Sequence, residues 1–157
     1  MTRIPVLCLA FLAASPAQAA FDPVAFFRGH SEGQGTLKIL LQSPVRVDVR
    51  SEGREEKDGS LLLIQQVRQA GQEPRTRYWR LKRQSPTRFT GTLTDAAGPV
   101  TVDVVGDRAR IRYTMKNRMS VEQWLTPTGQ KTVSNQMRVR RFGLVVAHLT
   151  ETIRKLD

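Results

Sequence analysis

The sequence of 157 residues is poor in the side chains that bind metals or form covalent cross-links. It contains one cysteine, Cys8, and two histidines, His30 and His148. A zinc site needs three or four protein ligands, mostly Cys, His or carboxylate, and an intramolecular disulfide needs two cysteines. We therefore expect no metal site, no disulfide and no cofactor.

Sequence signatures of catalysis are missing as well. The glycines at positions 29, 33 and 35 neither follow a predicted strand nor open a helix, so they form no nucleophile elbow and no phosphate-binding loop. Most acidic residues fall in predicted turns or on polar strand faces. The sequence thus nominates no catalytic residue and predicts a non-enzymatic protein, although an active site assembled only by the fold stays open.

Long hydrophobic runs are confined to the N-terminus. Arg3 precedes an apolar run over residues 4–14, and Ala17-Gln18-Ala19 supplies small residues for a signal peptidase. This pattern predicts a Sec-type signal peptide over residues 1–19, cleaved after Ala19, and a periplasmic or secreted chain of residues 20–157. Cys8 lies inside the removed segment. Later apolar runs are of strand length, so no transmembrane segment is expected after cleavage.

Alternation of apolar and polar residues with a period of two dominates the rest of the chain. The clearest example is residues 108–116, where Ala109, Ile111, Tyr113 and Met115 alternate with Arg, Thr and Lys. The same period recurs in residues 37–41, 45–50, 88–93 and 100–104. It is typical of strands with one buried and one solvated face.

Turn signals separate the alternating segments. They are Ser51-Glu52-Gly53, Asp58-Gly59, Ala70-Gly71-Gln72, Ser85-Pro86, Asp95-Ala96-Ala97-Gly98, Gly106-Asp107 and Pro127-Thr128-Gly129. About ten strands follow from this spacing, as an antiparallel meander closed into a barrel or folded into a sandwich. Asp22-Pro23 predicts one short helical turn before the first strand. The result is an all-β chain with a single domain.

Charge is strongly one-sided, with 25 Lys plus Arg against 14 Asp plus Glu and a net charge of +11. Several of these cations fall on predicted polar strand faces: Arg80, Lys82, Arg108, Arg110, Arg112, Arg138 and Arg140. Such faces either are simply solvated or contact an anionic surface, such as lipid or polysaccharide. Nucleic acid is disfavoured because the Trp and Tyr residues fall mainly at positions predicted to be core, which leaves few exposed rings for base stacking.

Arg77 is an exception, because it shares a predicted strand face with Trp79 and Leu81. A buried arginine needs a partner, and Glu122 is one candidate. Three readings stay open: a structural ion pair, a solvated residue at the strand end, or a clamp for a ligand carboxylate.

An ordered set of short motifs resembles the bacterial envelope family catalogued as domain of unknown function 3833. The set is Phe26-Phe27-Arg28-Gly29, Arg77-Tyr78-Trp79-Arg80-Leu81, Phe89-Thr90-Gly91, Trp124, Asn135, Phe142-Gly143 and the closing stretch to Arg154-Lys155. The similarity spans most of residues 26–155. It departs from the family at Glu122-Gln123, where the family tends to have two acids, and in lacking a lipoprotein signal. The resemblance implies a lipocalin-like barrel and no established activity.

A barrel of this size can hold one small ligand. We expect its interior to bind an apolar or amphipathic, lipid-like molecule, oriented by polar contacts from Arg77, Glu122 and Asn135 and lined by aromatic residues that include Trp79, Phe89, Tyr113 and Trp124. Leu93, Ile111 and Met115 complete the expected lining. The alternative is that the same residues simply fill the barrel, and that the protein acts through its basic outer faces.

Overall fold

The computed structural model describes residues 20–157, so the predicted signal peptide and its cleavage site lie outside the described residues. The elements, in chain order, are α1 (Pro23–Phe27), β1 (Gly29–Ile39), β2 (Val45–Glu55), β3 (Leu61–Gln69), β4 (Arg75–Ser85), β5 (Arg88–Leu93), β6 (Val100–Val105), β7 (Arg108–Thr114), β8 (Ser120–Gly129), β9 (Thr132–Arg141) and β10 (Leu144–Lys155). In residues 20–157 no helix combines the length and the apolar character needed to cross a membrane.

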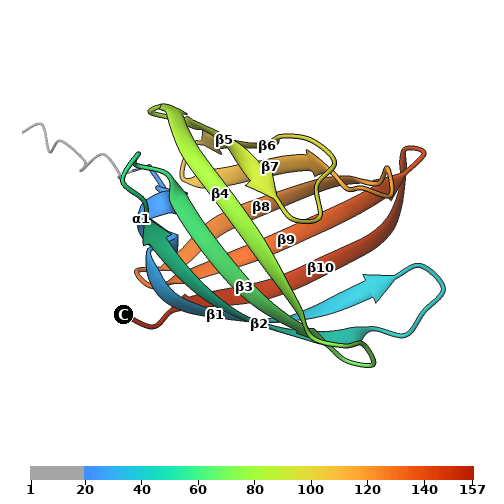
Figure 1. The fold of residues 1–157 in the computed structure, drawn as a ribbon. Helices are drawn as coiled ribbons and strands as arrows, with labels where there is room; N and C mark the ends of the chain where they lie inside the picture. Colours follow the sequence, from blue (N-terminus) through green and yellow to red (C-terminus); the bar gives the residue numbers. More distant parts are fainter. Residues whose placement is uncertain (1–19) are drawn as a thin grey trace, which may run out of the picture.

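The ten strands form one closed antiparallel barrel (Figure 1). Each strand pairs with its neighbour in sequence, and β1 closes the barrel by pairing with β10 from Ser31↔Lys155 to Ile39↔Ala147. The alternation predicted for residues 108–116 is observed, since Ala109, Ile111 and Tyr113 are buried in β7. The predicted all-β meander is therefore confirmed in its closed-barrel form.

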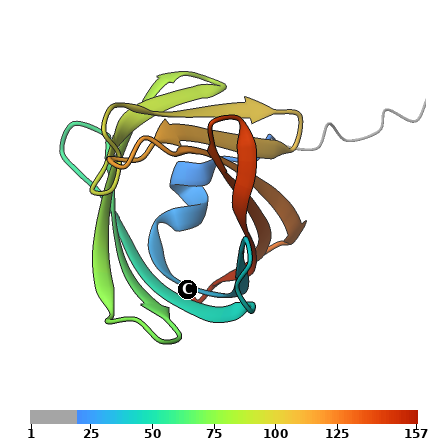
Figure 2. The same cartoon turned by 90° about the vertical axis from the view of Figure 1, so that its right-hand side faces the viewer.

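Helix α1 closes one end of the barrel. Asp22 caps it by accepting hydrogen bonds from the backbone N–H groups of Val24 and Ala25, and Pro23 occupies the first helical position, as predicted. Pro23 and Phe27 face the barrel interior. Figure 2 looks into the opposite end, and α1 is visible at the far end of the barrel.

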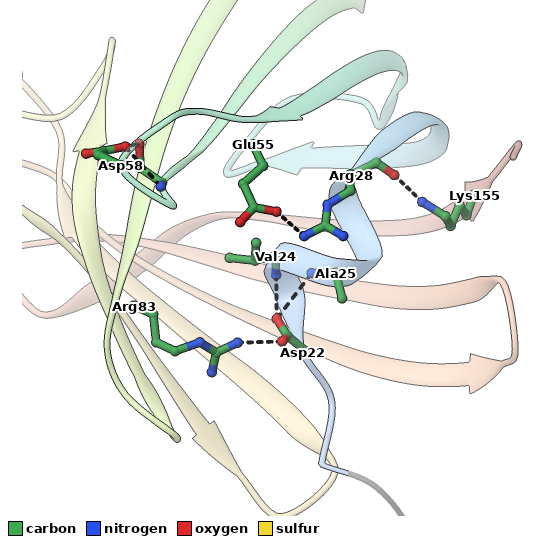
Figure 3. A network of polar contacts seen from close by, with 9 residues as sticks. Asp22, Val24, Ala25, Arg28, Glu55, Asp58, Arg83 and Lys155 are labelled. Atoms are coloured by element: carbon green, nitrogen blue, oxygen red, sulfur yellow. Dashed lines mark hydrogen bonds and ion pairs between the residues drawn. The ribbon is translucent and has the colours of Figure 1, made fainter.

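Polar contacts hold α1 against the surrounding strands (Figure 3). Asp22 pairs with Arg83 of β4, and Arg28 pairs with Glu55 of β2. Lys155 of β10 donates to the carbonyl oxygens of Phe26 and Arg28. These contacts come from three strands around the barrel, so this end is closed by a fixed plug.

Two predicted turns are instead parts of strands. Ser51-Glu52-Gly53 lies inside β2, where Gly53 pairs with Gly29 and Leu63. A Cβ atom at Gly53 would lie 1.8 Å from the Phe27 carbonyl oxygen, so this glycine permits the close approach of α1 rather than a chain reversal. Pro127-Thr128-Gly129 ends β8 with a register shift, and the chain reverses after it.

At the other end of the barrel, no helix formed by residues 20–157 crosses the opening. This end is formed by the β1–β2, β3–β4, β5–β6, β7–β8 and β9–β10 connections, since odd-numbered strands run toward it from the α1 end. We call it the open end. Any molecule that reaches the interior without displacing α1 must enter here.

Candidate functional site

The interior of the barrel contains an inner chamber of about 100 Å³ above α1. Its floor is made by Pro23 and Phe27, and its walls come from strands all around the barrel. The apolar wall residues include Leu63, Val67, Trp79, Ile111 and Leu125, and the polar ones include Gln65, Arg77, Gln123, Asn135 and Glu151. An apolar chamber with a few convergent polar groups is the usual form of a small-molecule site.

A second, mouth chamber of about 380 Å³ lies toward the open end. Its lining is mostly apolar and includes Ile39, Met115, Met119, Val139 and Val146. Leu37, Arg75, Arg77 and Met137 line both chambers, so the two adjoin. The mouth chamber alone lies within the range of ~300–1,000 Å³ typical of small-molecule sites.

Arg77 stands at the junction of the two chambers. Its Nε lies 2.8 Å from Oδ2 of Asp95, its Nη2 donates to the Tyr113 hydroxyl at 3.2 Å, and its guanidinium lies 5.2 Å from the ring centroid of Trp79. Only 13% of the Arg77 side chain is exposed. The partner of this buried arginine is therefore Asp95, and the suggested pairing with Glu122 is wrong.

Glu151 of β10 is the residue that sequence reasoning missed. It is 5% exposed and lines the inner chamber. The Asn135 amide donates to its Oε2 at 2.8 Å. Burial raises the pKa of the Glu151 carboxyl, and the Asn135 hydrogen bond and the charge of Arg77 oppose this only in part. The site thus contains a carboxyl group that is costly to ionise.

Two glycines make the room for Glu151. A Cβ atom at Gly33 would lie 2.0 Å from the Glu151 Oε1, and one at Gly35 would lie 2.9 Å from the Glu151 Cβ. Gly35 pairs directly with Glu151 in the sheet. Inward-facing glycines inside a strand are thus the sequence signal that could have revealed a buried long side chain on the neighbouring strand.

Hydrogen bonds organise the remaining polar side chains of the interior. The Trp79 indole N–H donates to Oε1 of Gln65 at 2.6 Å, and Nε2 of Gln123 donates to the Tyr113 hydroxyl at 3.4 Å. The Asn135 Oδ1 is buried and accepts no hydrogen bond from any described residue. An unsatisfied buried acceptor costs free energy, and this one lies on the chamber wall.

The structure brings four of the predicted site residues together. Arg77, Trp79 and Asn135 line the inner chamber, and Tyr113 lines the mouth chamber beside Arg77. Phe89 is fully buried in the core cluster and lines neither chamber. Phe89 is therefore a packing residue of the core, as expected under the alternative that the aromatic residues simply fill the barrel.

The placement of Glu122 and Trp124 in the interior is wrong. In β8 the inward residues are Val121, Gln123 and Leu125, which are buried. Glu122 faces outward and pairs with Arg110 at 2.5 Å, and this hydrogen bond lowers the pKa of its carboxyl. Trp124 is also on the outer face, where guanidinium groups of Arg108 and Arg110 lie 4.7 and 5.6 Å from its ring centroid.

Ser31, which lies two residues from a glycine on either side, is not placed as a catalytic nucleophile would be. Ser31, in the stretch Gly29-His30-Ser31-Glu32-Gly33, lies inside β1 instead of at a strand-to-helix turn. Its buried hydroxyl has no hydrogen-bonding partner among residues 20–157, so no base is positioned against it in that range. The same residues contain no group of three or more His, Cys, Asp or Glu placed to hold a metal ion.

Solved structures share this barrel at low sequence identity. The S-type phycobiliprotein lyase CpeS from Guillardia theta is 6% identical, with a TM-score of 0.66 over 85% of this chain and 90% of the lyase. Rv2717c from M. tuberculosis is 15% identical, with a TM-score of 0.62 over 87% of this chain and 99% of that one. These similarities show the fold, a lipocalin-like calycin barrel.

A protein of unknown function from the DUF3598 family of Nostoc punctiforme is 12% identical, with a TM-score of 0.67. That match covers 92% of this chain but 53% of the Nostoc protein. No curated protein sequence matches the chain. The signature of the family DUF3833, whose description is "protein of unknown function", matches residues 11–155. The chain belongs to the DUF3833 family.

Proposed function

We propose that this barrel is a non-enzymatic binding protein for a small, mostly apolar molecule that carries one polar group. The observation that carries the proposal is the pair of adjoining chambers, apolar over most of their lining and open at the end opposite α1. The apolar part of the ligand fills the mouth chamber, where its burial contributes most of the binding free energy. Its polar group reaches the inner chamber past Arg77.

The polar residues of the inner chamber favour a ligand that donates a hydrogen bond. The Asn135 Oδ1 offers an unused acceptor, and the Glu151 carboxyl lies beside it. Arg75 and Arg77 are the cations at the junction of the chambers, and they share Asp95, whose Oδ2 lies 2.8 Å from the Arg77 Nε and 3.8 Å from the Arg75 Nη1. A ligand hydroxyl or N–H group would satisfy the Asn135 Oδ1, whereas a ligand carboxylate has no hydrogen to donate to it.

A blocking substitution tests whether the chambers bind anything. Met137 lines both chambers, so Met137→Trp should fill the passage between them. Gln136→Trp is the matched control, because Gln136 is exposed on the outer face of the same strand. The protein purified gently from the expressing bacterium would be measured by native mass spectrometry, and dissociated molecules by denaturing mass analysis.

We expect a bound mass in the unmodified protein and in Gln136→Trp, and none in Met137→Trp. The melting temperature of Met137→Trp should equal that of the unmodified protein, so that loss of the bound mass is not due to unfolding. A clean apo mass for the unmodified protein, repeated after incubation with envelope lipid extract, would contradict ligand binding and favour a filled barrel. Decanol and decanoate then test the polar group by calorimetric titration. Preference for decanoate at neutral pH would contradict the hydrogen-bond-donor assignment.

The alternative, an anionic partner on the arginine-bearing outer faces, has weaker support. Arg110 pairs with Glu122, Arg112 with Asp103 and Arg80 with Glu56. Each pair reduces the charge available to a partner. Such binding would collapse at high salt, whereas binding inside the barrel would change little.

The site of action that we propose is the periplasm or the cell exterior. The basis is the signal-peptide pattern of residues 1–19 and the predicted cut after Ala19. N-terminal sequencing of the protein recovered from the periplasmic fraction tests it, and a mature N-terminus at Ala20 is expected. Recovery in the cytosol with Met1 or Thr2 at the N-terminus would refute the proposal.

A further inference from the structure

Exposed apolar side chains gather at one place on the described part of the molecule. Among residues 20–157, eight large apolar side chains are exposed, and five of them belong to two hairpins at the open end. We call these five the apolar rim: Leu40, Leu41, Phe142, Leu144 and Val145. The hairpins belong to adjacent strands, and the Leu40 N–H donates to the Val146 carbonyl oxygen at 2.8 Å.

The two residues with the most exposed of these side chains have positive φ angles, which are unfavourable for residues other than glycine. Leu41 is 96% exposed at φ 63°, and Phe142 is 92% exposed at φ 51°. Phe142 and Gly143, both with positive φ, form the two-residue connection between Arg141 and Leu144. Hairpins of this kind favour Asn-Gly or Asp-Gly, because a residue with a Cβ is strained at positive φ. Neither folding nor solubility accounts for a bulky apolar residue at both positions.

The charge within the two hairpins of the apolar rim has one sign. Residues 38–46 and 138–147, which contain both hairpin tips, hold five basic residues and no acidic residue. The basic residues are Lys38, Arg46, Arg138, Arg140 and Arg141. Asp48 pairs with Arg46, whereas no ion pair joins Arg138, Arg140 or Arg141 to a carboxylate of residues 20–157 in the structure. Apolar tips flanked by cations match the chemistry of a bilayer with anionic headgroups.

We propose that the apolar rim docks the open end of the barrel onto an anionic phospholipid bilayer. Leu41 and Phe142 enter the boundary between headgroups and acyl chains, and the flanking arginines contact lipid phosphates. Ile39, Arg141, Val146 and Ala147 line the mouth chamber next to these hairpins. Docking therefore turns the mouth of the barrel toward the membrane. This surface differs from the outer faces around Arg80, Arg110 and Arg112, whose guanidinium groups each pair with a carboxylate.

The backbone geometry gives a test that separates docking from folding. Asparagine tolerates positive φ, so the double substitution Leu41→Asn with Phe142→Asn removes both apolar side chains and should leave the melting temperature equal or higher. The matched control is Leu156→Asn, which removes an exposed leucine beyond β10, at the α1 end. All variants would be prepared identically, so that any contribution of residues 1–19 is the same in each.

Co-sedimentation would use vesicles of phosphatidylcholine alone and of phosphatidylcholine with phosphatidylglycerol in equal amounts. We expect the unmodified protein and Leu156→Asn to bind the anionic vesicles, and the double variant to bind them at least about tenfold more weakly. Binding should weaken at high salt and on neutral vesicles. Unchanged binding by the double variant, or no preference of the unmodified protein for anionic vesicles, would overturn the proposal. The result is independent of whether the chambers hold a ligand.

Discussion

The Glu151 carboxyl occupies the space that a side chain at Gly33 would need, since a Cβ built there lies 2.0 Å from its Oε1. Gly33→Ala should push the carboxyl away from Asn135 and destabilise the protein by about 1–3 kcal/mol, the cost of leaving buried polar groups unpaired. In a Glu151→Ala background the same substitution should cost much less. Urea denaturation of the two single variants and the double variant measures this coupling. Additive free energies would show that the two residues do not compete for this space.

The raised pKa of Glu151 predicts a stability that falls as pH rises. A carboxyl with a higher pKa in the folded state binds protons more readily when folded, so its favourable contribution is complete below the pKa of the unfolded chain, ~4.3. It is lost as pH rises through the folded pKa. Glu151→Gln cannot ionise and should melt higher than the unmodified protein at pH 8, with the difference shrinking toward pH 4.

Glu122→Gln is a control for which we expect the opposite pH dependence of stability. The hydrogen bond from Arg110 lowers the pKa of Glu122, so its contribution is present above the unfolded pKa and is lost as pH falls through the folded one. This variant should melt lower than the unmodified protein at neutral pH, with the difference vanishing in acid. Parallel pH profiles for the two variants would refute the assignment of Glu151 to the interior and Glu122 to the outer face.

Gly53→Ala should loosen the plug. Its Cβ atom would lie 1.8 Å from the Phe27 carbonyl oxygen, so α1 must shift, at a cost of about 1–3 kcal/mol typical of overpacking. Gly98→Ala is the matched control, because a Cβ atom there has nothing within 4 Å and its backbone is unstrained. Amide exchange of residues 24–28 should accelerate in the first variant alone. Equal protection in both would mean that α1 does not depend on this close approach.

The two tryptophans should differ in their contribution to stability. Trp79 is buried and its indole donates to Gln65, so Trp79→Ala should cost about 3–5 kcal/mol. Trp124 is half-buried on the outer face beneath Arg108, and Trp124→Ala should cost about 1 kcal/mol. Thermal unfolding of both variants measures the difference. Comparable losses of stability in the two variants would indicate that Trp124 is packed in the core.

Alternation was sufficient to predict the barrel strands, but Trp124 led to the wrong assignment of the faces of β8. The apolar residues Val121 and Leu125 are buried, which fixes their common face as the inward one. Gln123 shares that face and donates to Tyr113, whereas Trp124 lies on the outer face under arginine side chains. These two residues alone oppose the usual order of hydrophobicity, and the prediction followed the tryptophan instead of its neighbours.

The polar residues of the site were harder to predict than the strands because their partners are distant in sequence. Asp95 reaches Arg77 from the β5–β6 connection, whose position relative to the interior has no period-two signal. Glu151 follows a polar threonine in a strand with weak alternation. Only the geometry of β1 against β10 places it over Gly33 and Gly35.

Closure of the barrel by β1 and β10 has a consequence for the order of folding. Nine of the ten strand pairings join neighbours in sequence, whereas the tenth joins Ser31 to Lys155. During synthesis, the partner of β1 is the last strand of the barrel to be made, so the growing sheet keeps two unpaired edges until residues 144–155 are available. Exposed strand edges invite pairing with other chains. The nascent barrel is thus most exposed to pairing with other chains just before β10 is made, and it loses both free edges together when β10 joins β1.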